Sequence, residues 1–276
     1  MKIQRFAGNF KPTYWSKYCQ KELAKDLVVA NWCNYEFEGE VKYGERVKIV
    51  GAVRATIGNY VPGTDIAIEH LGDNAQYLDI DYADYFAFEV DDVDKAQSRP
   101  EYLSTEFDEA KTALAESMDA KVAEVAALGV LTNMKSASTD ISAETDFLAT
   151  VDAGLVKLYK NNVSTKELLA ADLNAEHITS IRKSLQNLFT DNVEYIKQGA
   201  IGKYNNVLLR LSNNLYNDGT DDYELIRTKK AVAVANQIEK VETCRKEKGF
   251  ASIIKGLNVY GAKVVRPKEL YVIRAH

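Results

Sequence analysis

One stretch decides the fold: residues 102–128 read YLSTEFDEAKTALAESMDAKVAEVAAL. Its apolar side chains recur every three or four residues, while charged side chains fill the opposite face. The pattern predicts an amphipathic helix about 40 Å long, because each helical residue adds roughly 1.5 Å. The side chains expected on its buried face are Leu103, Phe107, Leu114, Met118 and Val122. A helix of this length would form the backbone of the fold.

The chain before this helix predicts strands. Across residues 35–90 apolar and polar residues alternate, as at Leu78 and Ile80, and glycines and the pair Pro62-Gly63 lie at turn-like intervals. We expect long β ribbons that protrude and bury little surface in their own subunit. Residues 12–33 show three-to-four spacing instead, which predicts an amphipathic helix after an extended arm.

The chain after the helix predicts a mixed α+β part. Gly129 and the Ser/Thr-rich stretch 132–150 interrupt the helical periodicity, so we place the main internal boundary there. Beyond it, helical and strand-like patterns alternate, as in α+β domains. We expect helices at 166–171, 176–189 and 229–236, strands at 207–211, 223–227, 257–265 and 270–274, and a turn at 217–220.

The composition is that of a folded globular chain. Hydrophobic residues make up 46% and charged residues 27% of 276 residues. No run approaches the roughly 18 apolar residues of a membrane helix, and the residues after Met1 lack a secretory-signal pattern, which indicates cytoplasmic synthesis. Three cysteines and three scattered histidines show no disulfide or zinc-site spacing. We therefore expect no membrane contact, no metal, no cofactor and no enzymatic activity.

Charge is divided along the chain. The net charge of −5 gives no general attraction to nucleic acid. Residues 65–124 contain 17 acidic and 4 basic residues, a net charge of −13, whereas residues 227–276 contain 12 basic and 4 acidic residues, a net charge of +8. Two interpretations stay open. The charges cover solvated faces, or the acidic part of one copy contacts the basic part of the next.

The densest carboxylate group is Asp91, Asp92 and Asp94, between the last predicted strand and the long helix. Hard cations prefer several carboxylate oxygens, so a metal-dependent enzyme is one interpretation of this group. No second acidic cluster, phosphate-binding loop or activated serine accompanies it in the sequence. We therefore favour a solvated or interface turn.

Two groups of motifs resemble one protein family. The first reads YEFEGEVKYGERVKI at 35–49, NYVPGT at 59–64 and DYFAFEVDDVDKAQ at 84–97. The second reads LSNNL at 211–215, TKKA at 228–231 and IKGLNVYGAKVVRP at 254–267. In order and spacing they are similar to the major capsid proteins of tailed phages, whose Hong-Kong-97-type (HK97-like) fold is shared with bacterial encapsulins.

The resemblance implies an α+β HK97-like fold and a structural, non-enzymatic function. Copies would self-assemble into an icosahedral shell, the capsid of the virion, around the double-stranded DNA of a tailed phage. The implied parts are an N-arm and first helix, an extended E-loop with adjoining strands, a P-domain with a spine helix, a compact A-domain and a C-terminal segment that returns to the P-domain. Their expected ranges are 1–34, 35–90, 91–160, 161–241 and 242–276.

The resemblance also implies partners. They are copies of the chain in pentamers and hexamers, a portal and a scaffolding protein, and packaged DNA held by non-specific contact, with assembly in the host cytoplasm. In this family the E-loop lies over a neighbouring subunit. We expect ten residues at subunit interfaces: Lys42, Lys48, Pro62, Gly63, Asp91, Asp92, Asp94, Lys263, Arg266 and Lys268.

The sequence departs from the family in two ways. Between Leu169 and Gly202 it lacks a Pro-rich, Gly-Arg-containing strand segment, so we expect a compact or rearranged A-domain. The chain also starts almost at once with the N-arm, so we expect any scaffold to be a separate protein. Some members join an E-loop lysine to a neighbour's asparagine; Lys42 or Lys48 with Asn258 would be such a pair, but we favour ordinary surface roles.

The main alternative function is an encapsulin-like compartment that holds enzymes in place of a genome. A metal-dependent enzyme that uses the three aspartates is the alternative from a different class. Shell contents separate the first alternative from a capsid, and a cation bound in a concave pocket would identify the second.

Overall fold

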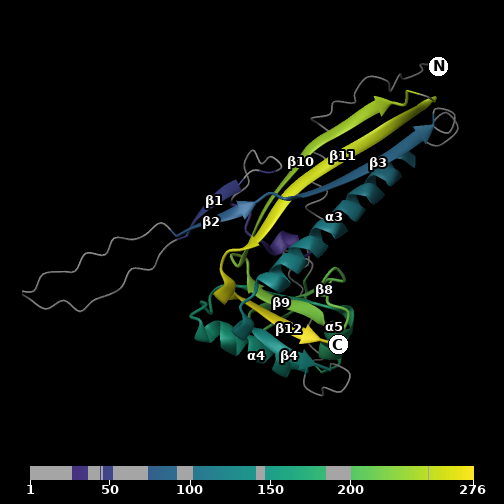
Figure 1. The fold of residues 1–276 in the computed structure, drawn as a ribbon. Helices are drawn as coiled ribbons and strands as arrows, with labels where there is room; N and C mark the ends of the chain where they lie inside the picture. Colours follow the sequence, from purple (N-terminus) through teal and green to yellow (C-terminus); the bar gives the residue numbers. More distant parts are fainter. Residues whose placement is uncertain are drawn as a thin grey trace, which may run out of the picture.

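The computed structural model describes residues 27–36, 44, 46–51, 74–91, 102–140, 147–184, 200–247 and 249–276. These residues form an elongated part, in which three strands run beside one long helix, and a compact part at one end of that helix (Figure 1). The fold is therefore α+β, as the sequence predicts.

The long helix is confirmed. Helix α3 spans Tyr102–Gly129, 28 residues, and ends at the predicted glycine. Phe107 and Leu114 are 4% and 5% exposed, and Met118 and Val122 are fully buried, so four of the five expected core side chains lie on its buried face. The side chain of Leu103 lies outside the described residues.

An antiparallel sheet covers one side of α3. Its strands are β3 (Tyr82–Asp91), β10 (Val232–Arg245) and β11 (Ala251–Val264), in the order β10-β11-β3. The ring of Phe86 on β3 meets the ring of Phe107 on α3 edge-on, 5.7 Å between centroids. Gly256 lies opposite Phe86, and a Cβ there would come within 2.4 Å of the ring. Glycine at this position therefore leaves room for the aromatic contact between sheet and helix.

A two-stranded ribbon is attached to this sheet. Strands β1 (Arg46–Gly51) and β2 (Asn74–Asp79) pair antiparallel. Ile49, Leu78 and Ile80 are buried in a small cluster with residues of β10 and β11, which confirms the predicted alternation in this segment. The protruding ribbon is predicted within residues 35–90, and residues 52–73 of this range lie outside the described residues, so that prediction is not tested.

The compact part is a mixed sheet with helices packed against it. Its strand order is β4-β12-β9-β5-β7-β6, and the short β8 pairs with β9. Helices α4 and α5 contact each other and the strands β12, β9 and β7. The strands are β4 (Lys135–Thr139), β5 (Leu169–Leu173), β6 (Ala200–Tyr204), β7 (Val207–Leu211), β8 (Tyr216–Asn217), β9 (Asp222–Thr228) and β12 (Leu270–Ala275), and the helices are α4 (Phe147–Lys160) and α5 (Ala175–Ser184).

Several sequence expectations for this half of the chain are correct. The strands predicted at 207–211, 223–227, 257–265 and 270–274 correspond to β7, β9, most of the second half of β11, and β12. The turn predicted at 217–220 joins β8 to β9, and α5 overlaps the helix predicted at 176–189.

Two helix assignments are wrong, and one helix was not predicted. Residues 166–171 lead into β5, and residues 229–236 form a turn and the start of β10. Both stretches are short and apolar, and such runs do not distinguish a buried strand from a helix by periodicity. Helix α4 begins at Phe147, inside the Ser/Thr-rich stretch 132–150 in which the sequence predicts a break. Of the predicted helix at 12–33, only residues 27–33 are described, and they hold the short 3-10 turn η1 (Ala30–Trp32).

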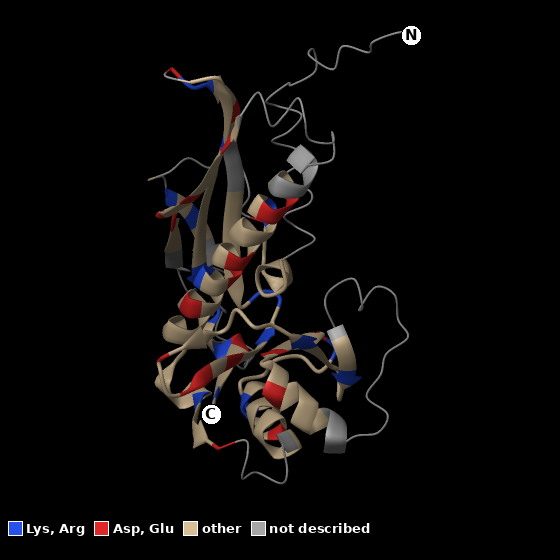
Figure 2. Cartoon of the chain, turned by 90° about the vertical axis from the view of Figure 1, so that its right-hand side faces the viewer, with Lys and Arg blue, Asp and Glu red and all other residues tan. Residues whose placement is uncertain are grey.

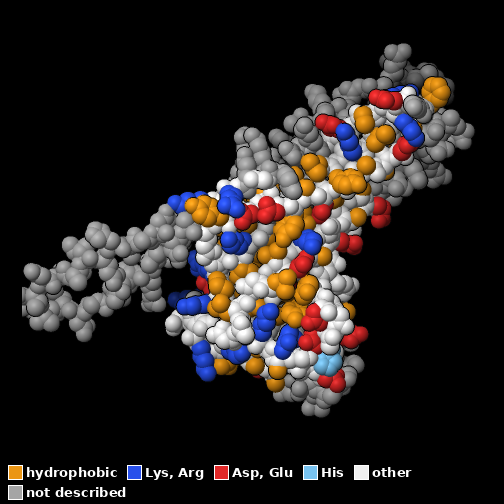
Figure 3. Space-filling model, viewed as in Figure 1, with side chains coloured by type: hydrophobic (Ala, Val, Ile, Leu, Met, Phe, Trp, Pro, Cys, Tyr) orange, Lys and Arg blue, Asp and Glu red, His pale blue; other side chains and the backbone are white. Residues whose placement is uncertain are grey.

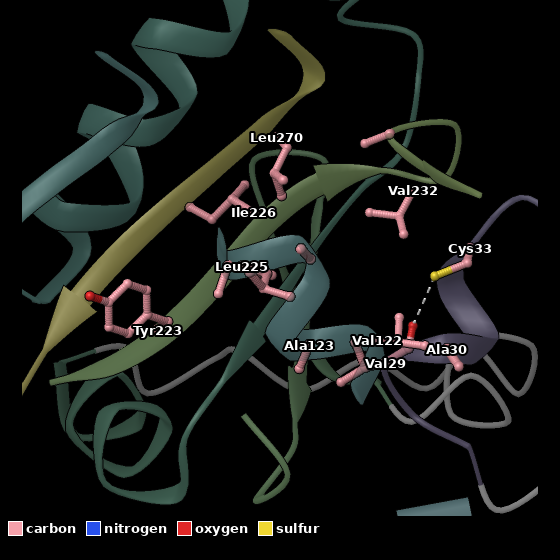
Figure 4. Packing of buried hydrophobic residues seen from close by; sticks show 14 of the residues in the cluster. Val29, Ala30, Cys33, Val122, Ala123, Tyr223, Leu225, Ile226, Val232 and Leu270 are labelled. Atoms are coloured by element: carbon pink, nitrogen blue, oxygen red, sulfur yellow. Dashed lines mark hydrogen bonds between the residues drawn. The ribbon is translucent and has the colours of Figure 1, made fainter. Parts of the chain in front are cut away.

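One main hydrophobic core joins the elongated and the compact part. Residues of η1, α3, β9, β10 and β12 belong to the same buried cluster (Figure 4). Two further 3-10 turns, η2 (Thr132–Met134) and η3 (Pro267–Glu269), lead into β4 and β12. None of the helices within the described stretches is long and apolar enough to cross a bilayer.

The buried face of α3 gives a first testable prediction. Met118→Ala removes a fully buried side chain and leaves a cavity, so we expect it to lower the free energy of unfolding by about 2–5 kcal/mol. Glu116→Ala, at an exposed position of the same helix, should change it by less than about 0.5 kcal/mol. Urea denaturation of the unassembled protein measures both, and equal effects would contradict the assigned face.

Candidate assembly interface

Five of the ten expected interface residues can be located. Asp91 ends β3, Lys48 lies on β1, Lys263 lies on β11, and Arg266 and Lys268 lie at η3. Lys42, Pro62, Gly63, Asp92 and Asp94 lie outside the described residues.

Asp91 lies at one end of the elongated part, and Lys263, Arg266 and Lys268 lie at the other. Asp91 is paired with Ala251 at one end of β11, and Lys263 is near the other end. The two ends of this strand are about 40 Å apart, since each residue adds roughly 3.3 Å. Figure 2 shows red acidic residues along α3 and blue basic residues gathered near its junction with the compact part. Asp91 and Lys263 therefore do not meet within one chain, whereas Lys246 of the basic region does contact Glu89 of the acidic region.

The basic end is partly engaged within its own chain. Lys263 donates a hydrogen bond from Nζ to the carbonyl of Tyr77, at 2.6 Å, and Tyr77 is also the strand partner of Lys48. Arg266 pairs with Glu269 at 3.0 Å, while Lys268 is exposed. Lys48 and Lys263 therefore lie near each other beside Tyr77. Of the basic group, Lys263 and Arg266 make the contacts named here.

The acidic end carries a strongly exposed aromatic ring. Phe250, in the turn between β10 and β11, is 80% exposed. Close by, Lys246 contacts both carboxylate oxygens of Glu89, at 2.8 and 2.9 Å. Hydrophobic side chains also form a stripe along the long strands (Figure 3). This end of the molecule combines apolar and charged groups, as protein contact surfaces do.

A buried carboxylate fixes the segment that enters the fold before the ribbon. Asp119, 1% exposed on α3, accepts hydrogen bonds from three consecutive backbone amides. Val28 N and Ala30 N lie 2.7 and 2.8 Å from its oxygens, and Val29 N lies 3.2 Å away. Burial raises the pKa of Asp119, while the three amide bonds oppose this shift. The carboxylate thereby satisfies the amide groups that begin η1.

Two buried arginines hold the other side of the same segment. Arg210 on β7 donates to the carbonyl of Val28 at 2.8 Å, and Arg227 on β9 donates to the carbonyls of Val29, at 2.6 Å, and Trp32. Both arginines also bind the carboxylate of Asp172 on β5. Both guanidinium groups and the carboxylate are fully buried.

We name Asp119, Asp172, Arg210 and Arg227 the anchor cluster. It ties the elongated part, through α3, and the compact part, through three strands, to one short segment. Buried charges are stable only when paired and hydrogen-bonded, and here each charge has such partners. Cys33 lies beside Arg227 Nη1 at 3.3 Å, and burial raises the pKa of its thiol. The contacts of the anchor cluster named here are all with groups of the same chain, so the cluster stabilises the fold.

The sequence analysis does not predict the four residues of the anchor cluster. Two strands do contain a pattern that indicates buried charges: Arg210 interrupts the apolar run VLLRL, and Asp172 interrupts LAADL. A single charge within a buried strand requires a partner, but the sequence does not identify which one.

The described residues hold no cluster of metal-ligand side chains. Among them, no group of three or more His, Cys, Asp or Glu side chains is placed to hold a metal ion. His177 and Glu224 form a buried pair at 2.5 Å in the compact part, and Glu224 also accepts a bond from Asn174 N. Asn258 is fully buried on β11, so its amide is not accessible to a lysine of another copy.

The comparisons with known proteins agree with this architecture. No family model matches the chain, and no curated protein matches it. A solved structure from Mycobacterium phage Che8 has 26% sequence identity and a TM-score of 0.68, over 99% of this chain and 95% of that chain. The capsid structure of cyanophage P-SCSP1u has 15% identity and a TM-score of 0.68, over 100% and 93%. The holo-SrpI encapsulin complex from Synechococcus elongatus has 12% identity and a TM-score of 0.55, over 73% and 76%.

The predicted resemblance is confirmed at the level of the fold. The chain has the HK97-like fold of phage capsids and encapsulins, and its structural neighbours include several tailed-phage capsids. The phage structures match over nearly the whole chain, and the encapsulin complex matches over 73% of it.

The anchor cluster gives a second prediction. Asp119→Ala leaves three buried amides without their acceptor, so we expect a loss of about 3–5 kcal/mol in the free energy of unfolding. Glu109→Ala, at an exposed position of α3, is the control. Urea unfolding followed by the fluorescence of buried Trp32, in a Trp15→Phe background, reports on the segment itself. A loss no larger than that of the control would show that the segment does not depend on Asp119.

Proposed function

We propose that this HK97-like chain is the major capsid protein of a tailed phage, and that its copies form an icosahedral shell around double-stranded DNA. The observation that carries the proposal is the likeness to phage capsids along nearly the whole chain. The chain acts in the shell, which assembles in the host cytoplasm from pentamers and hexamers. A portal and a scaffolding protein would take part, and packaged DNA would be held by non-specific contact.

The shape of the subunit supports repeated contacts between copies. The elongated part presents about 40 Å of strand and helix that has solvent, or another subunit, on its outer side. Asp91 and Lys263 lie at opposite ends of it, which suits a head-to-tail contact that closes into a ring. We assign Lys42, Lys48, Pro62, Gly63, Asp91, Asp92, Asp94, Lys263, Arg266 and Lys268 to these contacts.

The boundaries between the N-arm, E-loop, P-domain, A-domain and C-terminal segment are a proposal, and the packing supports two changes to them. The proposed limit at residue 241 falls within β10, which runs unbroken from Val232 to Arg245. Helix α4 contacts β12 and β9, so it packs with the compact part. We therefore propose that the compact part includes α4, excludes β10 and β11, and is completed by the returning strand β12.

Shell contents test the proposal against its alternative. Particles purified from cells that express the chain with its phage partners should protect double-stranded DNA from added nuclease. An encapsulin-like compartment would protect no DNA and would hold a protein cargo. Particles that contain only such a cargo would overturn the capsid proposal, and activity of the pure chain on a small molecule would overturn a purely structural function.

A third prediction concerns the basic end. Replacing Lys263, Arg266 and Lys268 with Glu should slow assembly more than it lowers the free energy of unfolding, because exposed ion pairs are worth only about 0–1 kcal/mol each and act by repetition. Light scattering across a salt series measures assembly rates, since screening weakens exposed pairs. The control, Lys160, Lys166 and Lys203 replaced with Glu, changes net charge equally at exposed positions of the compact part. Equal rates in the two triple variants would leave the charge division as a pattern of solvated faces.

A further inference from the structure

One end of the compact sheet is rich in lysine. Strand pairing brings several connections together at this end, because Thr228 of β9 lies opposite Leu169 of β5 and Arg227 lies opposite Leu270 of β12. These connections, with the residues that adjoin them, contain seven basic and two acidic residues. We name them the lysine edge; they are residues 160–168, 203–207, 229–231 and 265–269.

Side-chain contacts hold these connections next to one another. Asn206 donates hydrogen bonds from its amide to the carbonyls of Thr165 and Glu167, at 3.1 and 2.8 Å. Asn161, just after helix α4, donates to the carbonyl of Lys268 at 3.3 Å. The lysine edge is therefore one connected surface, although its residues come from four separate parts of the sequence.

Much of the positive charge on this surface has no counter-charge in the chain. Lys230 pairs with Glu167 at 2.6 Å. Within the described stretches, however, none of Lys160, Lys166 and Lys229 forms an ion pair, and all three are exposed. These ammonium groups are therefore available to an anionic partner.

The opposite end of the same strands is acidic. Its connections contain five acidic residues and no basic residue. They are residues 139–140, 174–176 and 211–222. Figure 3 shows this division, with blue side chains on the left of the compact part and red side chains on its right. The charges of the compact part therefore attract a polyanion to the lysine edge and repel it from the other end.

The exposed side chains of the lysine edge identify the kind of polyanion. Every exposed position in these described connections is Lys, Arg, Asn, Ser or Thr. Such side chains are the ones that bind phosphate oxygens of DNA. The centre of a protein contact is instead rich in apolar and aromatic side chains. Binding of single strands also uses aromatic side chains, on which bases stack. The composition therefore fits the backbone of a double helix better than a protein or a single strand.

We propose that the lysine edge binds the phosphate backbone of double-stranded DNA, so that this end of the compact part faces the interior of the shell. Amide and hydroxyl side chains between the lysines would donate further hydrogen bonds to phosphates. Arg266 and Lys268, at the border of the edge, stay assigned to contacts between copies. The inference rests on the proposed function, which supplies the enclosed DNA, and adds the surface that meets it. The lysines assigned to DNA are Lys160, Lys166, Lys203, Lys229 and Lys230.

Lysine acetylation in particles tests this surface without any substitution. DNA-filled particles, and the same particles after release of their DNA, are treated with a small acetylating reagent, and each lysine is followed by mass spectrometry. Acetylation of Lys160, Lys166 and Lys229 should be at least about fivefold slower in filled particles, because phosphates cover the amines. Lys121, exposed on the acidic helix α3, should react at the same rate in both.

A charge-removing variant tests the contact in solution. Lys160→Gln, Lys166→Gln and Lys229→Gln are combined, and binding of the unassembled chain to a short DNA duplex is measured by fluorescence anisotropy across a salt series. Each phosphate contact adds about 0.9 to the slope of log affinity against log salt, so the slope should fall by about 2.7. The control removes three exposed lysines of the elongated part and should keep the slope unchanged; it combines Lys121→Gln, Lys246→Gln and Lys255→Gln.

The outcomes separate this inference from the proposed function. Equal acetylation of the three lysines before and after DNA release, whether they are open in both states or covered in both, overturns the inference and leaves the proposed function in place. An unchanged salt slope in the variant also overturns it. Polyglutamate that binds as tightly as the duplex would assign the edge to an acidic protein segment in place of DNA. Particles that never contain DNA would overturn the proposed function, and this inference with it.

Discussion

The structure depends on one buried carboxylate and the three amides that it holds. Asp119 lies on the long helix and accepts hydrogen bonds from the amides of Val28, Val29 and Ala30. This short segment contacts both the elongated and the compact part, so holding it joins the two parts. On the other side of that segment, Arg210 and Arg227 bind its carbonyls and share Asp172. Without these partners four buried charges would be left uncompensated, which is among the costliest changes that a folded chain can undergo.

This junction bears on assembly because it sets the direction of the elongated part relative to the compact part. The elongated part has few ways to bury its own surface: its sheet has three strands, and β3 has one side without a strand among the described residues. Contacts between copies can supply that burial. The separation of Asp91 from Lys263 along β11 then becomes a property of an assembling subunit.

The sequence predicts those elements in which local pattern and tertiary packing agree. Helix α3 and strands β7, β9 and β12 have a periodicity that matches their burial, and they are found where expected. The segments around β5 and the start of β10 were mistaken for helices, because strands buried on both faces lose the two-residue alternation. Helix α4 was missed since the polar residues before it dominate the pattern. The contacts of the anchor cluster join residues up to 198 positions apart, as Arg227 and Val29 are, and no local pattern specifies such pairs. Of the ten expected interface residues, the five described ones lie at the two ends of the elongated part, and their contacts with other copies remain a prediction.

The most direct test of the central claim is an electron cryomicroscopy reconstruction of particles formed by the purified chain with its phage partners. The account predicts closed shells of pentamers and hexamers, in which the β10-β11-β3 sheet and α3 lie between neighbouring copies and the anchor cluster is intact inside each subunit. A purified chain that stays monomeric under all assembly conditions, or particles in which the elongated part contacts no other copy, would contradict it.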